Sequence, residues 1–479
     1  MKKIIPLLVL LIFSCKRSTE KEKIIPFAEE EKNYTEAYNL SKVWLKGQLD
    51  YESIPGLTMS VVQNQRIDWS IALGISDDQT ALKQSSLFSI CSISKLFTSI
   101  AIMQLVENGK IKLGDPISMY LPFFNLKQLY SESRPITIAN ILTHSSGLPR
   151  ESNHPYWSQP NFNFPSKEDV IGELAKQETL YPADKYYQYS NLGLALLGYV
   201  VEEVSKQSYD DYIEENIINP IGMDQTRTFM DIRKYGTDLA FGYSSKKRDG
   251  SRDLVPFFNA NGIDPAAGFS SNSIDLAKFA LWQLNLLSGI ESPILKAETL
   301  KKMHTTQLND TLTDVKRGYG FGIYGEDSKR RVGHGGSCPG YRSVLSIDTK
   351  KNRAFAVMIN ANGTNPSKYA NGVSKILDEV NLKKDQKPHK FADVEGFYNV
   401  QPWGGESYLS SWGDEIALLS IPSQEASFSR FKQIEEDHFR RILKNDSLGE
   451  ALYILRNSQG RVTGFKRHQN IYEYISDRR

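Results

Sequence analysis

FSICSISKLFTSIAIMQLVENG, the sequence of residues 88–109, places a serine at the start of a helix-like apolar segment. Ser92 precedes Lys95 by three residues, and residues three apart on a helix share one face, so the two side chains can lie together. Residues 96–106 are almost continuously apolar, which is typical of a helix enclosed by other elements. Gly109 is a suitable end for that helix. The segment therefore predicts a serine presented at the start of a buried helix.

This pair has the chemistry of an activated nucleophile. A serine hydroxyl is a weak nucleophile near neutral pH and needs a neighbouring group that accepts its proton. Lys95 can accept it only if burial and nearby positive charge lower its pKa towards neutrality. The Ser-x-x-Lys pattern occurs four times, starting at Ser18, Ser92, Ser244 and Ser429, but only Ser92 opens an apolar helix. We interpret Ser92 and Lys95 as catalytic, with a solvated pair as the alternative.

A phenol and a carboxamide stand two residues apart in the segment Tyr187-Gln188-Tyr189-Ser190-Asn191, just before helix-like residues 192–204. From a turn, Tyr189 can share a proton with Lys95 and Ser92, and Asn191 can bind a substrate amide or carbonyl. The same Tyr-x-Asn pattern occurs at Tyr369, so it is weak evidence by itself.

A glycine-rich segment is the third motif and consists of His334-Gly335-Gly336-Ser337-Cys338-Pro339-Gly340. It leads into two runs, 343–348 and 353–360, that predict an antiparallel hairpin. The glycines allow a substrate backbone to approach closely and leave an amide free to bind an oxyanion. Nearby, residues 320–325 match Gly-x-Gly-x-x-Gly, but a charged run follows them in place of an apolar helix. We therefore predict no dinucleotide site and no cofactor.

His144 offers another base, because a histidine beside a serine is a common proton acceptor. We favour the interpretation that it caps or packs a helix end, since Lys95 already fills the base position. Aromatic residues and prolines are frequent between residues 149 and 189. They predict either the rim of a cleft or ordinary surface packing, and both interpretations stay open.

The charge balance and the spacing of the histidines and cysteines bear on nucleic-acid binding and metal binding. Lys and Arg (58) nearly balance Asp and Glu (56), which gives no support for nucleic-acid binding. The seven histidines are scattered, with no His-x-x-x-His or Cys-x-x-Cys pattern, so we predict no metal site.

Cys91 and Cys338 flank the serine and the glycine-rich segment. We expect two buried free thiols, with a close approach of the two cysteines as the alternative.

The N-terminus has the features of an export signal. Two lysines precede an apolar run at residues 4–13 that is too short to span a bilayer, and Cys15 follows. The phrase Ile-Phe-Ser-Cys resembles the lipobox of bacterial lipoproteins, in which the cysteine is lipidated. We expect residues 1–15 to be a lipoprotein-type signal and residues 16–35 a charged tether, with simple secretion as the alternative. The predicted location is the bacterial cell envelope, in the periplasm or at the outer membrane.

The order of the three motifs resembles that of the β-lactamase-related, penicillin-recognising serine hydrolases. This group includes class C β-lactamases, D-alanyl-D-alanine carboxypeptidases and related esterases. The likeness covers residues 36–380 and includes FSICSISK at 88–95, LTHSSGLP at 142–149 and NLG at 191–193. It implies an α+β fold for residues 36–382, with an antiparallel sheet flanked by helices, a mostly helical lobe, and the site between them.

The resemblance also implies roles for the motif residues. Ser92 would attack a carbonyl and form an acyl-enzyme, while Lys95 and Tyr189 would share the general-base work. Asn191 would orient a small-molecule or short-peptide acyl substrate. The backbone amides of Ser92 and Ser337 would form the oxyanion hole, worth ~3 kcal/mol per donor in comparable enzymes.

His334, which with Gly335 and Gly336 would contact the substrate, departs from the lysine usual in β-lactamases and transpeptidases of this group. An unperturbed histidine has a pKa of about 6.5 and is mostly neutral at pH 7. We therefore favour an esterase or a peptidase acting on a D-amino-acid or other small acyl substrate over a dedicated β-lactamase. This interpretation predicts stronger binding of anionic substrates at lower pH. The competing class is a non-catalytic lipoprotein that binds peptidoglycan-type peptides in the same cleft.

The composition changes after about residue 382. Residues 383–388 predict a linker, and residues 391–479 predict a small antiparallel β domain with strand-like runs at 415–421, 451–455 and 471–475. The domain resembles the lipocalin-like β domains of some hydrolases in this group. Three roles stay open, which are rimming the cleft, binding a partner and stabilising the enzyme.

Overall fold

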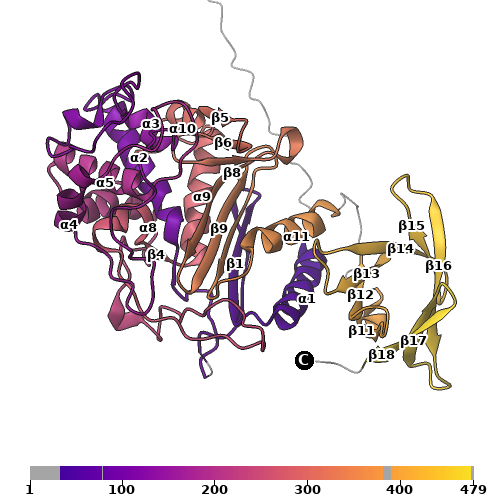
Figure 1. Cartoon of the computed structure of the whole chain (residues 1–479). Coiled ribbons are helices and arrows are strands. Elements are labelled where there is room, and N and C mark those ends of the chain that lie inside the picture. The colour runs from indigo at the N-terminus through magenta and orange to yellow at the C-terminus, as the bar shows by residue number, and fades with distance from the viewer. Residues whose placement is uncertain (1–32, 78, 381–389, 476–479) are drawn as a thin grey trace, which may run out of the picture.

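The computed structural model describes residues 33–77, 79–380 and 390–475. The predicted signal segment with Cys15, most of the predicted tether and the predicted linker 383–388 lie outside the described residues. Figure 1 shows a large part built of helices and a sheet, and a smaller all-β part beside it. No described helix combines the length and the apolar character that crossing a membrane requires.

An eight-stranded antiparallel sheet forms the centre of the large part, in the order β2-β1-β10-β9-β8-β7-β6-β5. Its strands are β1 (Gly56–Gln63), β2 (Arg66–Gly74), β5 (Leu308–Asp310), β6 (Val315–Arg317), β7 (Gly322–Tyr324), β8 (Arg331–Cys338), β9 (Tyr341–Asp348) and β10 (Arg353–Ile359). β9 and β10 pair as neighbours, which confirms the predicted hairpin. β1 and β10 are buried along their whole length, because helices cover both faces of the sheet.

The alternation of side chains along β10 shows how the two faces are covered. Ala354, Ala356 and Met358 join one core, and their neighbours Phe355, Val357 and Ile359 join the other. On the first face α9 (Ser273–Leu287) packs against β1, β2 and β10. On the second face α1 (Thr35–Glu52) and α11 (Pro366–Asp378) pack together.

α2 (Ser94–Glu107) is the centre of the helical lobe and packs against α5 (Asn191–Ser205) and α8 (Asp264–Ala267). Every residue of α2 from Ser94 to Leu105 is buried, which confirms the prediction of an enclosed helix. A short pair of strands, β3 (Phe88–Ser89) and β4 (Ser270–Ser271), leads into it. The other helices of the lobe are α3 (Ile138–Leu142), α4 (Lys167–Glu173), α6 (Tyr209–Ile213), α7 (Asn219–Ile221) and α10 (Ala297–Met303).

The C-terminal part is a closed antiparallel barrel of β11–β18. Its strands are β11 (Gly396–Asn399), β12 (Glu406–Trp412), β13 (Glu415–Ile421), β14 (Phe428–Glu435), β15 (His438–Ile442), β16 (Leu448–Arg456), β17 (Val462–Arg467) and β18 (Asn470–Ile475). The three predicted runs fall in β13, β16 and β18. A cluster of buried side chains fills the barrel, among them Leu409, Ile416, Phe431, Leu452 and Phe465.

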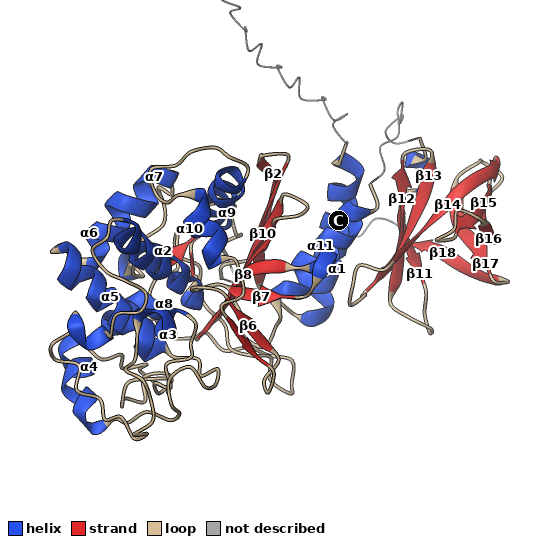
Figure 2. Ribbon diagram, turned by 90° about the horizontal axis from the view of Figure 1, so that it is seen from above, coloured by secondary structure: helices blue, strands red, loops and turns tan. Residues whose placement is uncertain are grey.

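The barrel docks on α1 and α11, as Figures 1 and 2 show. Trp44 of α1 is fully buried, and its indole Nε1 donates to the carbonyl oxygen of Ser423 at 3.1 Å. Leu419 and Ile421 of the barrel belong to the same apolar cluster as Trp44. The cavities beside Ser92 are lined by residues of the large part alone, so the described part of the barrel does not rim that cleft.

Candidate active site

Ser92 lies in the 3₁₀ turn Cys91–Ile93, which leads into α2. The turn is held from the lobe, because the N–H of Ile90 donates to the carbonyl oxygen of Phe269 at 2.9 Å. Cys91 adopts a φ of 51°, a left-handed conformation that is uncommon for a residue other than glycine. This sharp turn presents the partly exposed side chain of Ser92 to a cleft between the lobe and β8.

Lys95, one helical turn further on, lies beside Ser92 as the spacing predicts. Its Nζ is 3.1 Å from Ser92 Oγ, 2.6 Å from Asn191 Oδ1 and 2.7 Å from the carbonyl oxygen of Ala266. Burial lowers the pKa of Lys95 well below its usual value; Glu151 opposes this shift, whereas Arg150 and Arg317 add to it. The surroundings therefore favour the neutral amine.

A neutral amine in this position is suited to accept a proton from Ser92. It has two N–H groups and one lone pair. The carbonyl oxygens of Asn191 and Ala266 accept the two N–H groups, which leaves the lone pair for the hydroxyl proton of Ser92. The geometry and the charge state thus agree on Lys95 as a general base.

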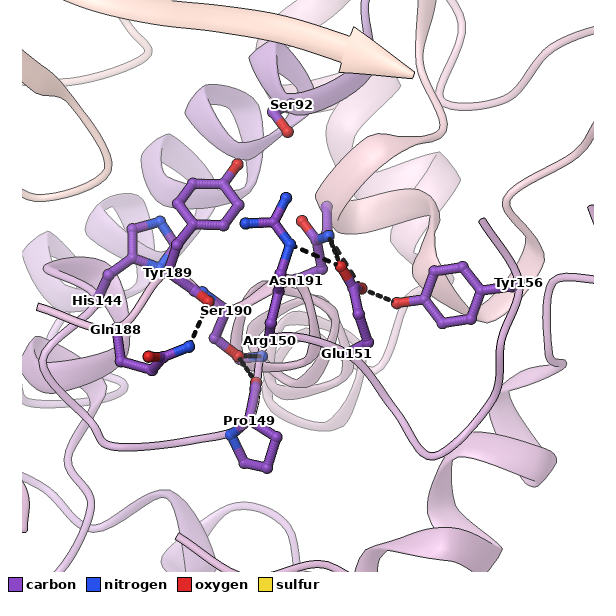
Figure 3. A network of polar contacts seen from close by, with 12 residues as sticks. Ser92, His144, Pro149, Arg150, Glu151, Tyr156, Gln188, Tyr189, Ser190 and Asn191 are labelled. Atoms are coloured by element: carbon purple, nitrogen blue, oxygen red, sulfur yellow. Dashed lines mark hydrogen bonds and ion pairs between the residues drawn. The ribbon is translucent and has the colours of Figure 1, made fainter. Parts of the chain in front are cut away.

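Tyr189 presents its hydroxyl to Ser92 (Figure 3). Burial raises the pKa of Tyr189, and this effect outweighs the opposing hydrogen bond with Ser92 and the positive charge of Arg317. Lys95 Nζ and Arg150 Cζ each lie 4.8 Å from the centre of its ring, where a cation is attracted to the aromatic face. Tyr189 is therefore a neutral phenol, which can relay a proton but is not a phenolate base.

Asn191 is the first residue of α5 and is held at both ends of its side-chain amide. Oδ1 faces Lys95, while Nδ2 donates to the two carboxylate oxygens of Glu151 at 2.8 and 3.0 Å. The helix start is fixed by Ser190, whose hydroxyl accepts the N–H of Gly193 at 2.8 Å. Asn191 thus has a structural partner on each side in addition to its predicted contact with substrate.

Glu151 is a site residue that the sequence did not reveal. It accepts hydrogen bonds from Asn191 and from the hydroxyl of Tyr156, and it forms an ion pair with Arg150 Nε at 3.0 Å (Figure 3). Its side chain is 20% exposed, so the carboxylate lies just beneath the floor of the cleft. The available signal was its place directly after the phrase at 142–149, but nothing in the sequence shows that this loop returns to α5.

His144 packs against Tyr189 and makes no described hydrogen bond with Ser92. Its ring stacks on the ring of Tyr189 with centres 4.3 Å apart, and its Nδ1 accepts the N–H of Ser190 at 3.1 Å. Its carbonyl oxygen accepts the N–H of Gln188 at 2.7 Å. These contacts fit the interpretation that His144 packs and caps, and they hold the backbone on both sides of Tyr189.

The glycine-rich strand β8 turns an unpaired edge towards Ser92. β7 pairs with residues 331–333 of β8, and no described strand continues along that edge beyond Gly333. Cys338 pairs with Tyr341 across a two-residue turn, and in an antiparallel ladder alternate residues direct their N–H groups outward. Ser337 therefore directs its amide towards the open edge, where an oxyanion can bind.

Gly335 and Gly336 of β8 lack a side chain for different structural reasons. A Cβ atom on Gly336 would lie 2.3 Å from the carbonyl oxygen of Ile90 and 2.1 Å from Ser343 Oγ, so only glycine lets the strand pass the serine turn. A Cβ atom on Gly335 would meet nothing closer than 3.7 Å. Gly335 is exposed and leaves room for a substrate, whereas Gly336 is required for packing.

His334 is buried and neutral. Burial lowers its pKa well below the usual value, and the positive charges of Arg317 and Lys95 lower it further. Nδ1 lies 2.7 Å from the carbonyl oxygen of Gly335, and Nε2 has no partner among the described residues. The expectation that His334 gains charge on mild acidification, and so strengthens anion binding, is not supported by this environment.

The expectation of two free thiols is wrong, because a disulfide joins Cys91 and Cys338. Their Cα atoms are 5.7 Å apart although 247 residues separate them in the sequence. The pairing follows from the close passage of β8 over the serine turn at Gly336. Spacing along the chain contained no information about that passage.

Two cavities meet at Ser92, and both also include Arg150 and Ser337. The first, of about 440 Å³, is called the aromatic half and includes Trp157, Phe162, Val255 and Pro339. The second, of about 460 Å³, is called the arginine half and includes Tyr189, Arg317, Tyr324, His334 and Arg342. Among the residues that the structure describes, no Asp or Glu side chain lines either half. Part of the aromatic stretch 149–189 therefore does rim the cleft.

Across the described ranges, no group of three or more His, Cys, Asp or Glu side chains is arranged to hold a metal ion.

Known proteins share this chain's sequence pattern over most of the large part. A family model described as Beta-lactamase matches residues 44–376. Beta-lactamase-like protein 2 of Dictyostelium discoideum is 28% identical over 356 residues, which cover 72% of this chain and 62% of that protein. Protein flp of Staphylococcus aureus (strain MW2) is 27% identical over 337 residues, which cover 69% of this chain and 63% of that protein. The matches thus span less than two thirds of these relatives.

Solved structures share the fold. The octameric penicillin-binding protein homologue from Pyrococcus abyssi has a TM-score of 0.62 and 24% identity, covering 92% of this chain and 98% of that chain. The Beta-lactamase/D-alanine Carboxypeptidase from Yersinia pestis has a TM-score of 0.60 and 20% identity, covering 73% of this chain and 99% of that chain. The predicted arrangement of an antiparallel sheet, flanking helices and a helical lobe is therefore confirmed.

Proposed function

Since the chain belongs to the beta-lactamase family, we propose that it is a serine hydrolase that cleaves an ester or an amide through an acyl-enzyme on Ser92. The observation that carries this proposal is the 3.1 Å contact between Ser92 Oγ and Lys95 Nζ, in surroundings that favour the neutral amine. A serine beside a neutral, buried lysine is an activated nucleophile.

Acylation follows from the placement of these groups. Ser92 Oγ attacks the substrate carbonyl carbon as its proton passes to the lone pair of Lys95 Nζ. The carbonyl oxygen becomes an oxyanion, which the amides of Ser92 and Ser337 stabilise. The C–O or C–N bond to the leaving group then breaks, and the leaving group takes the proton from Lys95 directly or through the hydroxyl of Tyr189.

Deacylation uses the same groups in the reverse sense. A water molecule gives its proton to Lys95 as its oxygen attacks the acyl carbon, and Lys95 then returns that proton to Ser92 Oγ as the ester bond to Ser92 breaks. The positive charge formed on Lys95 in each step is balanced by Asn191 Oδ1, the carbonyl oxygen of Ala266 and, through Asn191, Glu151.

The two halves of the cleft suggest which part of the substrate binds where. Tyr189 lines the arginine half, and the group that it can protonate is the leaving group. The leaving group would therefore lie beside Arg317 and Arg342, and the acyl group would occupy the aromatic half. With His334 neutral, arginine is the source of positive charge for a carboxylate there.

These features favour an esterase or a peptidase whose leaving group carries a negative charge. A short peptide that ends in a free D-amino acid has such a group, and so does an ester of a hydroxy acid. We place this activity ahead of dedicated β-lactam turnover, which the experiment below examines in parallel.

The test is active-site labelling of protein that lacks residues 1–15, with a fluorescent fluorophosphonate and, separately, a fluorescent penicillin. Fluorophosphonate labelling that disappears in Ser92→Ala supports the proposal. Ser244→Ala is the matched control, because Ser244 starts another Ser-x-x-Lys pattern and lines the same cleft. Penicillin labelling in addition would favour β-lactam or peptidoglycan substrates. No labelling by either probe would favour a non-catalytic receptor that binds peptidoglycan-type peptides.

We propose, further, that the chain is exported to the bacterial cell envelope and anchored through a lipid on Cys15. The support is the sequence of residues 1–15 alone. Expression of the full chain and of Cys15→Ala, followed by membrane fractionation and mass spectrometry of the N-terminal peptide, tests it. A soluble wild-type protein that retains residues 1–15 would overturn the proposal.

A further inference from the structure

A disulfide joins the two segments that carry the proposed oxyanion-hole amides. Cys91 directly precedes Ser92, and Cys338 directly follows Ser337. We propose that the Cys91–Cys338 disulfide is a positioning element that sets the distance and the angle between the amides of Ser92 and Ser337. The inference rests on the proposed function, because an oxyanion hole acts only where a tetrahedral intermediate forms.

The strand that supplies one of these amides lacks support on the side of the cleft. Beyond Gly333, the edge of β8 that faces Ser92 has no strand partner within the described chain. A strand end held by a ladder on one side alone can bend away from the neighbouring turn. A covalent link at Cys338 limits this movement directly beside the backbone amide of Ser337.

The turn that supplies the other amide is conformationally costly. Cys91 has a φ of 51°, a left-handed conformation that is sterically unfavourable for a residue with a Cβ atom. Such a conformation persists only where the surroundings hold it. The turn is held by a hydrogen bond from Ser343 Oγ of β9 to the carbonyl oxygen of Ile90 at 3.2 Å, and the disulfide adds a covalent bond to Cys338 at the end of β8.

The sulfur atoms are placed for a permanent link and are poorly accessible to reductants. Cys91 is 0% exposed and Cys338 is 5% exposed. Ser89 Oγ covers the pair, at 3.3 Å from the sulfur of Cys338 and 3.7 Å from the sulfur of Cys91. This burial favours a fixed positioning role over a redox switch.

The hairpin that contains Cys338 has other anchors, so its fold does not depend on the disulfide. Asn362 Oδ1 accepts the N–H of Gly340 at 2.6 Å, and Asn362 Nδ2 donates to the carbonyl oxygen of Cys338 at 2.9 Å. The hydroxyl of Tyr341 donates to the carbonyl oxygen of Ala240 at 2.6 Å. A variant without the disulfide should therefore fold, with the strand end less precisely placed.

The experiment compares the wild-type full chain, purified under oxidising conditions, with the double variant Cys91→Ala/Cys338→Ala and with Ser89→Ala. The last variant changes the neighbour of both sulfurs but leaves the disulfide intact. Three quantities are measured on folded protein: kcat and KM for an activated ester, and the affinity of a boronic acid. A boronic acid forms a tetrahedral adduct with a serine and places an oxygen in the oxyanion hole.

We expect the double variant to lose at least ~10-fold in kcat and in boronic-acid affinity, with KM changed less than ~3-fold, because the hole acts in the transition state. Ser89→Ala should keep kcat within ~2-fold of the wild type. If the disulfide were merely structural, its removal would lower the melting temperature and leave the kcat of folded protein unchanged.

Two results overturn the inference. One is a folded double variant with wild-type kcat and boronic-acid affinity. The other is peptide mapping of the unreduced wild-type protein that finds no linked Cys91 and Cys338. A wild-type protein that neither turns over esters nor is labelled at Ser92 overturns the proposed function, and the positioning role with it.

Discussion

Asn191 Oδ1 accepts a hydrogen bond from Lys95 Nζ at 2.6 Å. The same side chain donates to both carboxylate oxygens of Glu151, so one amide connects the base to a partly buried carboxylate. Protonation of Lys95 during the reaction places a positive charge at one end of this connection. The carboxylate of Glu151 supplies a negative charge at the other end. Burial dominates the pKa of Lys95, and Glu151, a residue that the substrate need not touch, partly offsets that effect.

Glu151→Gln is expected to move the pH dependence of catalysis. The charge of Glu151 raises the pKa of Lys95 against the dominant effect of burial, so its removal lowers that pKa further. Lys95 then stays neutral to a lower pH, and the acidic limb of the kcat/KM profile should shift to lower pH. Tyr156→Phe removes a hydrogen bond to Glu151 without changing charge and should leave the limb in place. A limb that moves to higher pH in Glu151→Gln would contradict this assignment.

Lys95→Met is expected to slow acylation by ~10²–10⁴-fold, the usual contribution of a positioned base. Methionine fills the buried site of Lys95 without offering a lone pair of comparable basicity. The measurement is the burst rate with an activated ester, with circular dichroism to check the fold. Burst kinetics close to the wild type would show that another group accepts the proton from Ser92.

Arg342→Gln is expected to raise KM by ~10-fold for a substrate with an anionic leaving group and to leave a neutral analogue unaffected. Arg342 lines the arginine half and donates to Ser337 Oγ at 2.7 Å. Lys350→Gln is the control, because it removes an equal charge from an exposed turn of the same hairpin. An equal loss for charged and neutral substrates would indicate that Arg342 acts through Ser337 and does not bind the anion.

His304 is expected to reduce stability as the pH falls. Burial lowers its pKa to about 3, with Arg330 adding to the effect, so the unfolded chain binds a proton near pH 6.5 while the folded chain does not. Linkage then removes about 1.4 kcal/mol from the free energy of unfolding between pH 7.5 and pH 5.5. His304→Gln can keep the contact with Gln283. In denaturant titrations at the two pH values, the free energy of unfolding of this variant should fall by about 1.4 kcal/mol less than that of the wild type. Equal falls in both proteins would mean that His304 titrates normally.

Ser92 and Lys95 could be predicted from the sequence because their relationship is local. Three residues of spacing and a following apolar run determine that the two side chains share one turn of a buried helix. The two runs at 343–348 and 353–360 on either side of a short polar turn are likewise a local signal, and the hairpin that they predict is confirmed. Tyr189 and His334 were placed near Ser92 by the order of motifs in a resembling family, not by any short-range pattern.

The parts that were missed depend on tertiary approach. Glu151 reaches Asn191 because a loop folds back across 40 residues, and no periodic signal in the sequence reports such a return. Cys91 and Cys338 pair across 247 residues because Gly336 lets β8 pass the serine turn. The low pKa of His334 depends on burial and on Arg317, neither of which is evident from the neighbours of His334 in the sequence.

The position of α1 between the sheet and the barrel has a consequence for the order in which the chain folds. α1 is the first described helix to leave the ribosome, and β2, made soon after it, covers part of its surface; its other apolar partners are α11, made more than 300 residues later, and β13, made later still. Contacts so distant in sequence cost loop-closure entropy and form late. Trp44 and its neighbours therefore wait, exposed, until synthesis is nearly complete. β12 and β13, made after the whole of the large part, thus cover the first helix, and a chain truncated before the barrel leaves that helix with an uncovered apolar surface.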